Sequence, residues 1–183
     1  MLVIDLAPFP TLTTERLVLR ALVPTDAPAL FAIRADERVM QFIGRRRATT
    51  LQDASDLISA IHAGTEANDG ITWAITLKGD DTLIGTIGYY RLKKEHYRGE
   101  IGYMLSADHW RKGIMGEALE AAVACGFDHL GFHSIEADTD PLNIASNTLL
   151  ARHGFVREGL FKENFFWDGV FRDSAIWSRL APR

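Results

Sequence analysis

The chain has 183 residues, of which 47% are hydrophobic and 24% are charged, and its formal net charge is -4. This ordinary globular composition excludes a disordered or fibrous protein, and the acidic balance excludes the broad basic surface that general nucleic-acid binding requires. We therefore expect one domain over residues 1–183 with its own buried core, and no nucleic acid as a partner.

Targeting, membrane and metal signals are not evident in the sequence. Residues 1–10 lack the basic start and long apolar run of a signal peptide, and no apolar run approaches the length of a membrane span. We therefore expect a cytoplasmic protein with no membrane partner. Cys125 is the single cysteine and is expected to be a buried helical residue. The six histidines show no metal-ligand spacing, so we expect no metal.

The first half of the chain predicts one strand, two helices and then three strands. Leu17, Val18 and Leu19 lie in a predicted strand over residues 13–22. Pro24-Thr25-Asp26 then begins a helix that runs through Ile33, with Thr25 or Asp26 as its N-cap. Helical spacing predicts a second helix over 50–67. Alternating apolar residues predict strands over 71–78, 82–92 and 97–105, with a turn at 79–81.

The second half of the chain predicts two strand–helix units and a hairpin. Its elements are a helix over 113–130, a strand over 133–139, a helix over 143–153, and strands over 154–167 and 170–180 around the Asp168-Gly169 turn. The order is β-α-α-β-β-β-α-β-α-β-β. It predicts an α+β fold in which helices pack on a mixed sheet, rather than the strict alternation of a doubly wound fold.

One strand–turn–helix segment has the features of a phosphate-binding site. The strand that ends at Leu105 leads into a short polar loop, and Arg111-Lys112-Gly113 then opens the helix that contains Gly116. Unpaired N–H groups and the positive end of the helix dipole favour an anion there, and glycines allow close approach. A structural connection with two solvated cations is the alternative interpretation of these residues alone.

A second segment downstream strengthens the hypothesis of a ligand site. Asp140-Pro141 follows a strand, and the next helix begins near Asn143 and ends at Gly154-Phe155. Asn143 and Ser146 are three residues apart, so both face the same side of the first helical turn. Both could act only as helix caps or exposed polar residues. The functional interpretation places the Asn143 amide and the Ser146 hydroxyl against a ligand that lies between two splayed strands.

In their order and spacing, these segments resemble the GNAT superfamily of N-acetyltransferases, and more closely its RimJ/RimL-type branch. The resemblance covers nearly the whole chain. It rests on Thr14-Glu15-Arg16-Leu17-Val18-Leu19-Arg20, Glu100-Ile101-Gly102-Tyr103, Lys112–Ala118, Ile135-Glu136-Ala137, Asn143–Ser146, Gly154-Phe155, Asp168-Gly169 and Arg172-Asp173. It implies the acyl-CoA N-acyltransferase fold: a mixed, mostly antiparallel sheet of about seven strands and about four helices, splayed between the fourth and fifth strands.

The resemblance also implies a site for acetyl-CoA as co-substrate. The backbone of Tyr103, Met104 and Leu105 pairs with the pantetheine arm. The amides of Arg111, Lys112, Gly113, Ile114, Met115 and Gly116 hold the pyrophosphate, and Asn143 and Ser146 contact the cofactor. The family pattern Gln/Arg-x-x-Gly-x-Gly/Ala is not fully met, because Trp110 and Met115 occupy its first and last positions.

The catalytic groups are a base for the acceptor amine and an acid for the leaving thiolate. Glu100 is the first candidate for the base because it lies just upstream of the cofactor segment on the same strand. Asp138 is the second, and Glu136 shares its strand face. Many family members place a proton-donating tyrosine where this chain has Leu150. The RimJ/RimL-type branch offers a serine instead, and Ser146 matches it.

The resemblance leaves the acceptor open. A protein or peptide N-terminal amine is the first expectation, and a polyamine, antibiotic or amino acid is the alternative. Because Leu150 replaces the tyrosine, a non-catalytic acyl-CoA-binding domain is a further alternative. A nucleotide-binding P-loop is a poor fit, because no Gly-Lys-Ser/Thr follows the turn. The family likeness also implies a homodimer.

Overall fold

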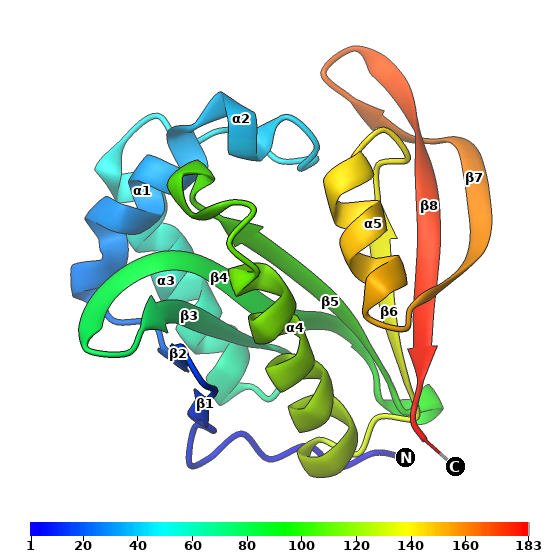
Figure 1. Cartoon of the computed structure of the whole chain (residues 1–183), viewed down its shortest axis with the longest axis horizontal. Coiled ribbons are helices and arrows are strands. Elements are labelled where there is room, and N and C mark those ends of the chain that lie inside the picture. The colour runs from blue at the N-terminus through cyan, green and yellow to red at the C-terminus, as the bar shows by residue number, and fades with distance from the viewer. Residues whose placement is uncertain (183) are drawn as a thin grey trace.

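An eight-stranded sheet forms the centre of the structure (Figure 1), a computed structural model that describes residues 1–182. The strand order is β1-β2-β3-β4-β5-β6-β8-β7, and within the described residues only the β5–β6 pair is parallel. The strands are β1 (Leu12–Thr13), β2 (Leu17–Ala21), β3 (Ile71–Leu77), β4 (Asp80–Lys93), β5 (Arg98–Leu105), β6 (Ser134–Thr139), β7 (Val156–Trp167) and β8 (Val170–Leu180).

Helices cover both faces of this sheet (Figure 1). They are α1 (Ala27–Ala35), α2 (Glu37–Met40), α3 (Leu51–Glu66), α4 (Ile114–Ala124) and α5 (Ile144–Arg152). Short 3-10 turns span Pro24–Asp26, Lys94–His96 and Ala107–His109, and a π-helical turn over Cys125–His129 extends α4. The apolar faces of α4 and α5 pack on one side of the sheet, and those of α1 and α3 pack on the other.

The two faces of the sheet build two separate apolar cores. The larger core includes Leu119 and Val123 of α4, Leu150 of α5 and alternate residues of the strands. The smaller core includes Leu30 of α1 and Ile58 of α3. β3, β4 and β5 contribute alternate residues to the two cores, as the period of a strand dictates.

Two helices begin where the sequence predicts, but only one of them has a side-chain cap. Thr50 caps α3 as half of a capping box, because its hydroxyl accepts from Asp53 N while the Asp53 carboxylate accepts from Thr50 N. Asp26 precedes α1 as predicted, but its carboxylate does not cap the helix. It accepts instead from the Arg20 guanidinium at 2.8 and 2.9 Å and from Val23 N at 2.8 Å.

The feature that positions the site is the early end of pairing between β5 and β6. Only Arg98–Ser134, Gly99–Ile135 and Glu100–Glu136 are register partners in this pair. Beyond Glu100 the two strands diverge, and the gap between them widens toward the top of Figure 1. The predicted splay is thus confirmed.

The expected fold class is confirmed, with one more strand and one more helix than predicted. The additional elements are β1, with two residues, and α2, with four. Neither is long enough to show a hydrophobic period, so sequence patterning could not reveal them. Within residues 1–182, no helix combines the length and apolar character needed to cross a bilayer.

One buried hydroxyl helps to seat α4 on the sheet. Tyr89 of β4 is 1% exposed, and its hydroxyl donates to the Ala122 carbonyl of α4 at 2.8 Å. We expect Tyr89→Phe to lower the free energy of unfolding by about 1–2 kcal/mol, because one buried hydrogen bond is lost without a change in packing volume. Urea denaturation measures this. Tyr97→Phe, at a half-exposed tyrosine, is the control and should change stability by less than about 0.5 kcal/mol.

Candidate functional site

The turn between β5 and α4 is held by contacts to its own flanks. Trp110 donates its indole N–H to the Leu105 carbonyl at 2.9 Å, which ties the loop to the end of the strand. Arg111 and Gly113 both have positive φ, at 60° and 75°. Glycine tolerates this left-handed conformation and arginine adopts it at a cost, so the turn stores some backbone strain. Such strain is common at ligand sites.

The start of α4 has the backbone chemistry of an anion site. Gly113 is the N-cap, and the first intrahelical bond at this end runs from Glu117 N to the Gly113 carbonyl. The amides of the preceding helical residues, Ile114, Met115 and Gly116, therefore have no helical acceptor. No side chain among the described residues caps this end. With the exposed cations of Arg111 and Lys112 beside it, the turn fits a pyrophosphate.

The predicted ligands on α5 lie opposite β5 across the splay. The hydroxyls of Tyr103 and Ser146 are 2.7 Å apart. Burial is the main cause that raises the pKa of Tyr103 to about 12, although its bond to Ser146 opposes the shift. Tyr103 is therefore a neutral phenol at physiological pH and can donate to Ser146. Asn143 is the N-cap of α5, since its side-chain oxygen accepts from Ser146 N at 3.1 Å.

Asn147 is a key residue of the α5 entry that the sequence analysis did not single out. Its side-chain nitrogen donates to the carbonyls of Asp140 and Pro141, both at 3.1 Å. Its side-chain oxygen accepts from Thr139 and from Trp177. These four bonds fix the turn from β6 into α5 and so fix where Ser146 lies. In the sequence, the one signal for this role is an asparagine, which can both donate and accept hydrogen bonds, close to the predicted N-cap.

A clamp holds α4 and α5 together below the gap. Glu120 of α4 accepts from His153 Nδ1 at 2.8 Å and from Arg179 of β8 at 2.9 Å. Desolvation opposes ionisation of Glu120, but the bonds from Arg179 and His153 outweigh it and lower the pKa of this carboxyl. The clamp joins the two helices to β8 at the level where β5 and β6 are still paired, since Arg179 is the register partner of Ile135.

The candidate bases lie on the opposite face of the sheet from Tyr103 and Ser146. Ile101, Tyr103 and Leu105 pack toward the core of α4, whereas Met104 packs toward α1 and α3. By alternation, Glu100 shares the face of Met104. Glu100 therefore borders the gap on one face of the sheet, and the hydroxyls of Tyr103 and Ser146 border it on the other.

Glu100 is a partly buried, salt-bridged carboxylate. Arg91 donates to its two oxygens at 2.9 and 3.1 Å. A β-bulge in β4 and a positive φ of 50° at Arg91 direct this arginine toward Glu100. Desolvation nonetheless raises the pKa of Glu100, and the charges of Asp138 and Glu136 add to the shift against the opposing effect of Arg91.

The other two candidate carboxylates have different surroundings. Glu136, the register partner of Glu100, accepts from Lys93 at 3.2 Å and from Arg98 at 3.0 Å. Asp138 is exposed, but the surrounding protein still desolvates it enough to raise the pKa of its carboxyl, against the effect of Ser174. All three carboxylates face the same side of the splayed strands, as the alternation predicts.

Tyr90 and an arch above it shape this second face. The Tyr90 hydroxyl occupies the position that a Cβ at Gly102 would need, so the phenol end of the ring lies against β5 at Gly102. Although Tyr90 is 38% exposed, the surrounding protein desolvates its hydroxyl and raises its pKa to about 12. Over this face, the segment between α2 and α3 reaches the β7–β8 hairpin, where Gly44 packs against the Phe165 ring. These two segments form an arch over the second face.

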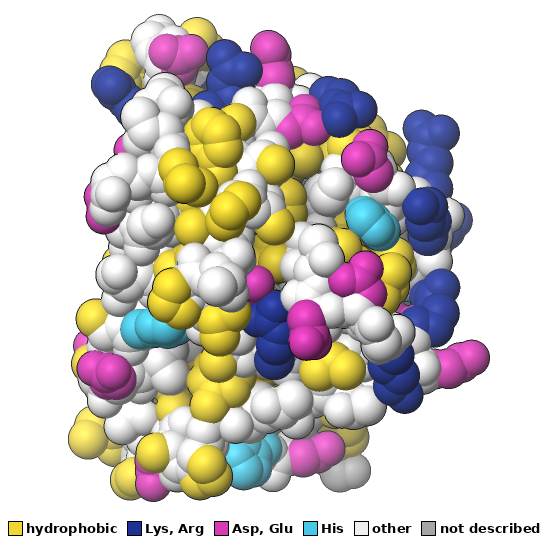
Figure 2. Space-filling view, turned by 90° about the vertical axis from the view of Figure 1, so that its left-hand side faces the viewer, with side chains coloured by type: hydrophobic (Ala, Val, Ile, Leu, Met, Phe, Trp, Pro, Cys, Tyr) yellow, Lys and Arg dark blue, Asp and Glu magenta, His cyan; other side chains and the backbone are white. Residues whose placement is uncertain are grey.

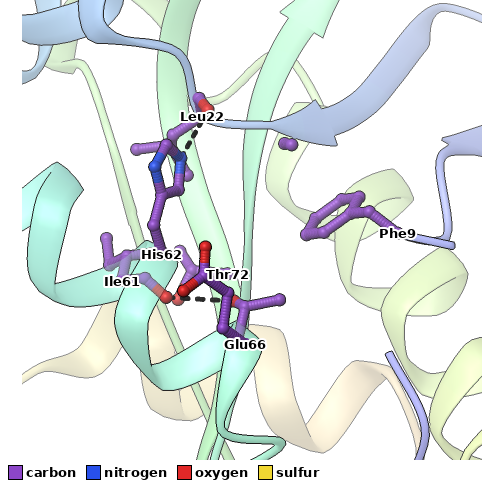
Figure 3. Close-up of a pocket in the computed structure, with 8 residues that line it drawn as sticks. Phe9, Leu22, Ile61, His62, Glu66 and Thr72 are labelled. Atoms are coloured by element: carbon purple, nitrogen blue, oxygen red, sulfur yellow. Dashed lines mark hydrogen bonds between the residues drawn. The ribbon is translucent and has the colours of Figure 1, made fainter. Parts of the chain in front are cut away.

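Two cavities lie away from these groups. One of about 150 Å³ lies between α3 and the β2–β3 region, where His62 Nε2 is 2.8 Å from the Leu22 carbonyl and Phe9 forms a wall (Figure 3). The other, of about 300 Å³, borders α1 and His109. On the face shown in Figure 2, acidic and basic side chains are interspersed with a broken band of apolar ones. The described residues contain no cluster of His, Cys, Asp or Glu suited to a metal ion.

Comparisons with known proteins agree on one family. Residues 16–156 match the acetyltransferase (GNAT) domain family. The uncharacterized N-acetyltransferase YoaA of Bacillus subtilis is 35% identical over 96% of this chain and 99% of its own length. The ribosomal protein uS5-alanine N-acetyltransferase of Escherichia coli is 27% identical, with coverages of 93% and 91%. RimJ of Mycobacterium smegmatis, solved with CoA-disulfide, has a TM-score of 0.82 at 24% identity, with coverages of 90% and 82%.

The close contact between Tyr90 and β5 makes Gly102 sensitive to substitution. We expect Gly102→Ala to lower the free energy of unfolding by about 1–3 kcal/mol, because the new methyl group must displace the Tyr90 ring. In a Tyr90→Leu background the same substitution should cost clearly less, which a double-mutant cycle by urea denaturation measures. Gly64→Ala in α3 is the control, since nothing lies within 4 Å of its new Cβ. Equal costs in both backgrounds would refute the contact.

Proposed function

The chain belongs to the GNAT family of N-acetyltransferases, and from that premise we propose that it transfers an acetyl group from acetyl-CoA to the N-terminal amine of a protein or peptide. The observation that carries the proposal is the splay between β5 and β6, which opens to a hydroxyl pair on one face and to carboxylates on the other. One gap can thus receive two substrates from opposite faces.

The residues of the gap fit acetyl-CoA. The free amides at the start of α4, with Arg111 and Lys112, would hold its pyrophosphate. From Ile101 onward, β5 has no register partner in β6, so one backbone edge of Tyr103–Leu105 is available to the amides of the pantetheine arm. The side-chain nitrogen of Asn143 is available as well, because the helix cap uses only the side-chain oxygen. Bound there, acetyl-CoA supplies a reactive thioester.

The two faces of the gap divide the proton transfers between them. Glu100 takes the proton from the acceptor amine, directly or through water, so that the amine can attack. A main-chain N–H near Met104 stabilises the oxyanion of the tetrahedral intermediate. On the other face, Ser146 protonates the departing sulfur, and the neutral Tyr103 phenol can replenish its proton. Leu150 is fully buried in the larger core and takes no part.

The choice of acceptor rests on relatives and on the shape of the second face. The Escherichia coli relative acts on an alanine of ribosomal protein uS5. In this chain, Asp138 is exposed beside Glu100 on the second face, so a chain end can reach these carboxylates from solvent. A small amine remains the alternative acceptor.

The proposal is tested first by binding and then by an acceptor screen. We expect calorimetry to show selective binding of acetyl-CoA, with ATP and NAD as controls. Thiol release should then be fastest with peptides that carry a free N-terminal amine. Matched N-terminally blocked peptides control for lysine acetylation. Faster turnover of polyamines or amino acids would replace the peptide acceptor, and no acetyl-CoA binding by folded protein would refute the proposal.

The role of Glu100 predicts a specific pH dependence. Because its pKa is raised, the carboxylate is ionised only above that raised value, and kcat should rise as pH increases through it. We expect Glu100→Gln to lower kcat by about 10²–10⁴-fold and remove this rising limb, while acetyl-CoA affinity changes little. Asp138→Asn is the matched control. An unchanged profile in Glu100→Gln together with a lost limb in Asp138→Asn would assign the base to Asp138.

Three further expectations stay predictions: the single-domain organisation, the cytoplasmic location and the homodimer. For the last of these, the β7–β8 hairpin offers apolar surface. Phe161, Phe166 and Phe171 are all more than half exposed there. Exposed aromatic side chains gathered on one element are typical of association surfaces.

A further inference from the structure

The turn between β1 and β2 packs directly against the start of α4. Thr14 and Leu17 order this turn, because Thr14 N donates to the Leu17 carbonyl at 3.1 Å and Leu17 N donates to Thr14 Oγ1 at 3.0 Å. Arg16 lies at its tip and reaches across to α4, about a hundred residues later in the chain. None of the expected roles in the acetyl-CoA site involves this arginine.

Arg16 spans the whole pyrophosphate turn. Its Nη1 donates to the Lys112 carbonyl at 2.9 Å, just before the helix. Its Nε donates to Glu117 Oε2 at 2.6 Å, in the first helical turn. Between these two contacts, its Nη2 would lie 3.3 Å from a Cβ at Gly113. One guanidinium therefore bonds Lys112, lies beside Gly113 and bonds Glu117 in the helix that follows.

The bond to Lys112 sets the direction of a backbone donor. A peptide unit is planar and trans, so its C=O and N–H point in opposite directions. With the Lys112 carbonyl held toward Arg16, the N–H of Gly113 points away from the guanidinium. This orientation keeps a main-chain donor available at the turn, in the left-handed conformation that Gly113 adopts.

The bond to Glu117 removes a charge that would repel phosphate. Glu117 is acidic and lies in the first turn of α4, where its carboxylate accepts from Thr14 Oγ1, Arg16 N and Arg16 Nε. Although desolvation opposes its ionisation, these bonds hold the pKa of Glu117 below its usual value, so it carries a full negative charge at neutral pH. Paired with Arg16, it leaves the cations of Arg111 and Lys112 to act on an incoming anion.

We propose that Arg16 is a positioning residue for the pyrophosphate of acetyl-CoA, which holds the 111–116 turn in its receptive conformation and neutralises Glu117. The inference rests on the proposed function, because it concerns the same cofactor site. The two arginines of the Thr14–Arg20 segment thus have different roles. Arg16 contacts the cofactor turn, whereas Arg20 pairs with buried Asp26 within the fold.

The test is a charge cycle read by calorimetric binding. We expect Arg16→Gln to weaken CoA binding about tenfold, because it exposes the charge of Glu117 to the phosphates and frees the Lys112 carbonyl. Glu117→Gln alone should bind CoA as tightly as the wild type or more tightly. The double variant should recover part of the affinity that Arg16→Gln loses. A merely structural ion pair would instead weaken binding in both single variants without recovery.

A second ligand separates positioning from general damage. Acetyl-pantetheine lacks the pyrophosphate, so its affinity should be the same in the wild type and in Arg16→Gln. Arg38→Gln is the matched control, since Arg38 also makes an exposed ion pair, with Asp36 at 2.6 Å. Arg16→Lys, which keeps the charge, should show intermediate CoA affinity. It replaces Arg16→Gln in the binding test if that variant is unstable.

The possible results separate this inference from the proposed function. Wild-type protein that binds CoA together with an Arg16→Gln variant of equal affinity would overturn the role of Arg16 alone. Equal losses for CoA and acetyl-pantetheine would also overturn it. A wild type that does not bind CoA would instead overturn the proposed function.

Discussion

The parallel pairing of β5 and β6 stops after three residue pairs, and the rest of the site depends on this termination. A sheet that continued its hydrogen bonds past Glu100 and Glu136 would close the gap and satisfy both strand edges. Because pairing ends there, one edge of β5 is left available to a ligand, and both faces of the sheet open into the same gap. The helices that follow β5 and β6 then present their N-terminal ends beside it. An open backbone edge and a helix start are complementary to the two halves of CoA, an amide-containing arm and a pyrophosphate.

Polar side chains tie together the elements that border the gap. The Tyr103–Ser146 bond spans the gap from β5 to α5, and the Glu120–His153–Arg179 clamp joins α4 to α5 and β8. Asn147 anchors the β6–α5 turn through its four bonds. Polar contacts of this kind are directional, so they fix the relative positions of the elements that they join.

Local features of the sequence predicted most of this architecture, whereas contacts distant in sequence could not be inferred. The sequence predicts both the turn before α4 and the start of α5, because their glycines, cations and N-cap residues lie within a few positions of one another. Patterning could not show that Arg16 reaches Lys112 and Glu117, or that Arg91 pairs with Glu100 through a bulge. Such contacts depend on which strands become neighbours and on local register shifts. The interpretation of Asn143 as a helix cap is correct, and its use as a ligand contact remains a proposal.

The two departures from the family pattern become understandable once the turn is seen as a main-chain site. Trp110 stands where the pattern has Gln or Arg, yet its indole anchors the loop to the Leu105 carbonyl. Met115 stands where the pattern has Gly or Ala, and its side chain packs against the larger core. In the proposed site, the groups offered to the phosphates are backbone N–H groups, which every residue but proline supplies. What must be kept is the path of the backbone, and that path is held here by the left-handed Gly113 and by the contacts of Trp110 and Arg16 on its two sides.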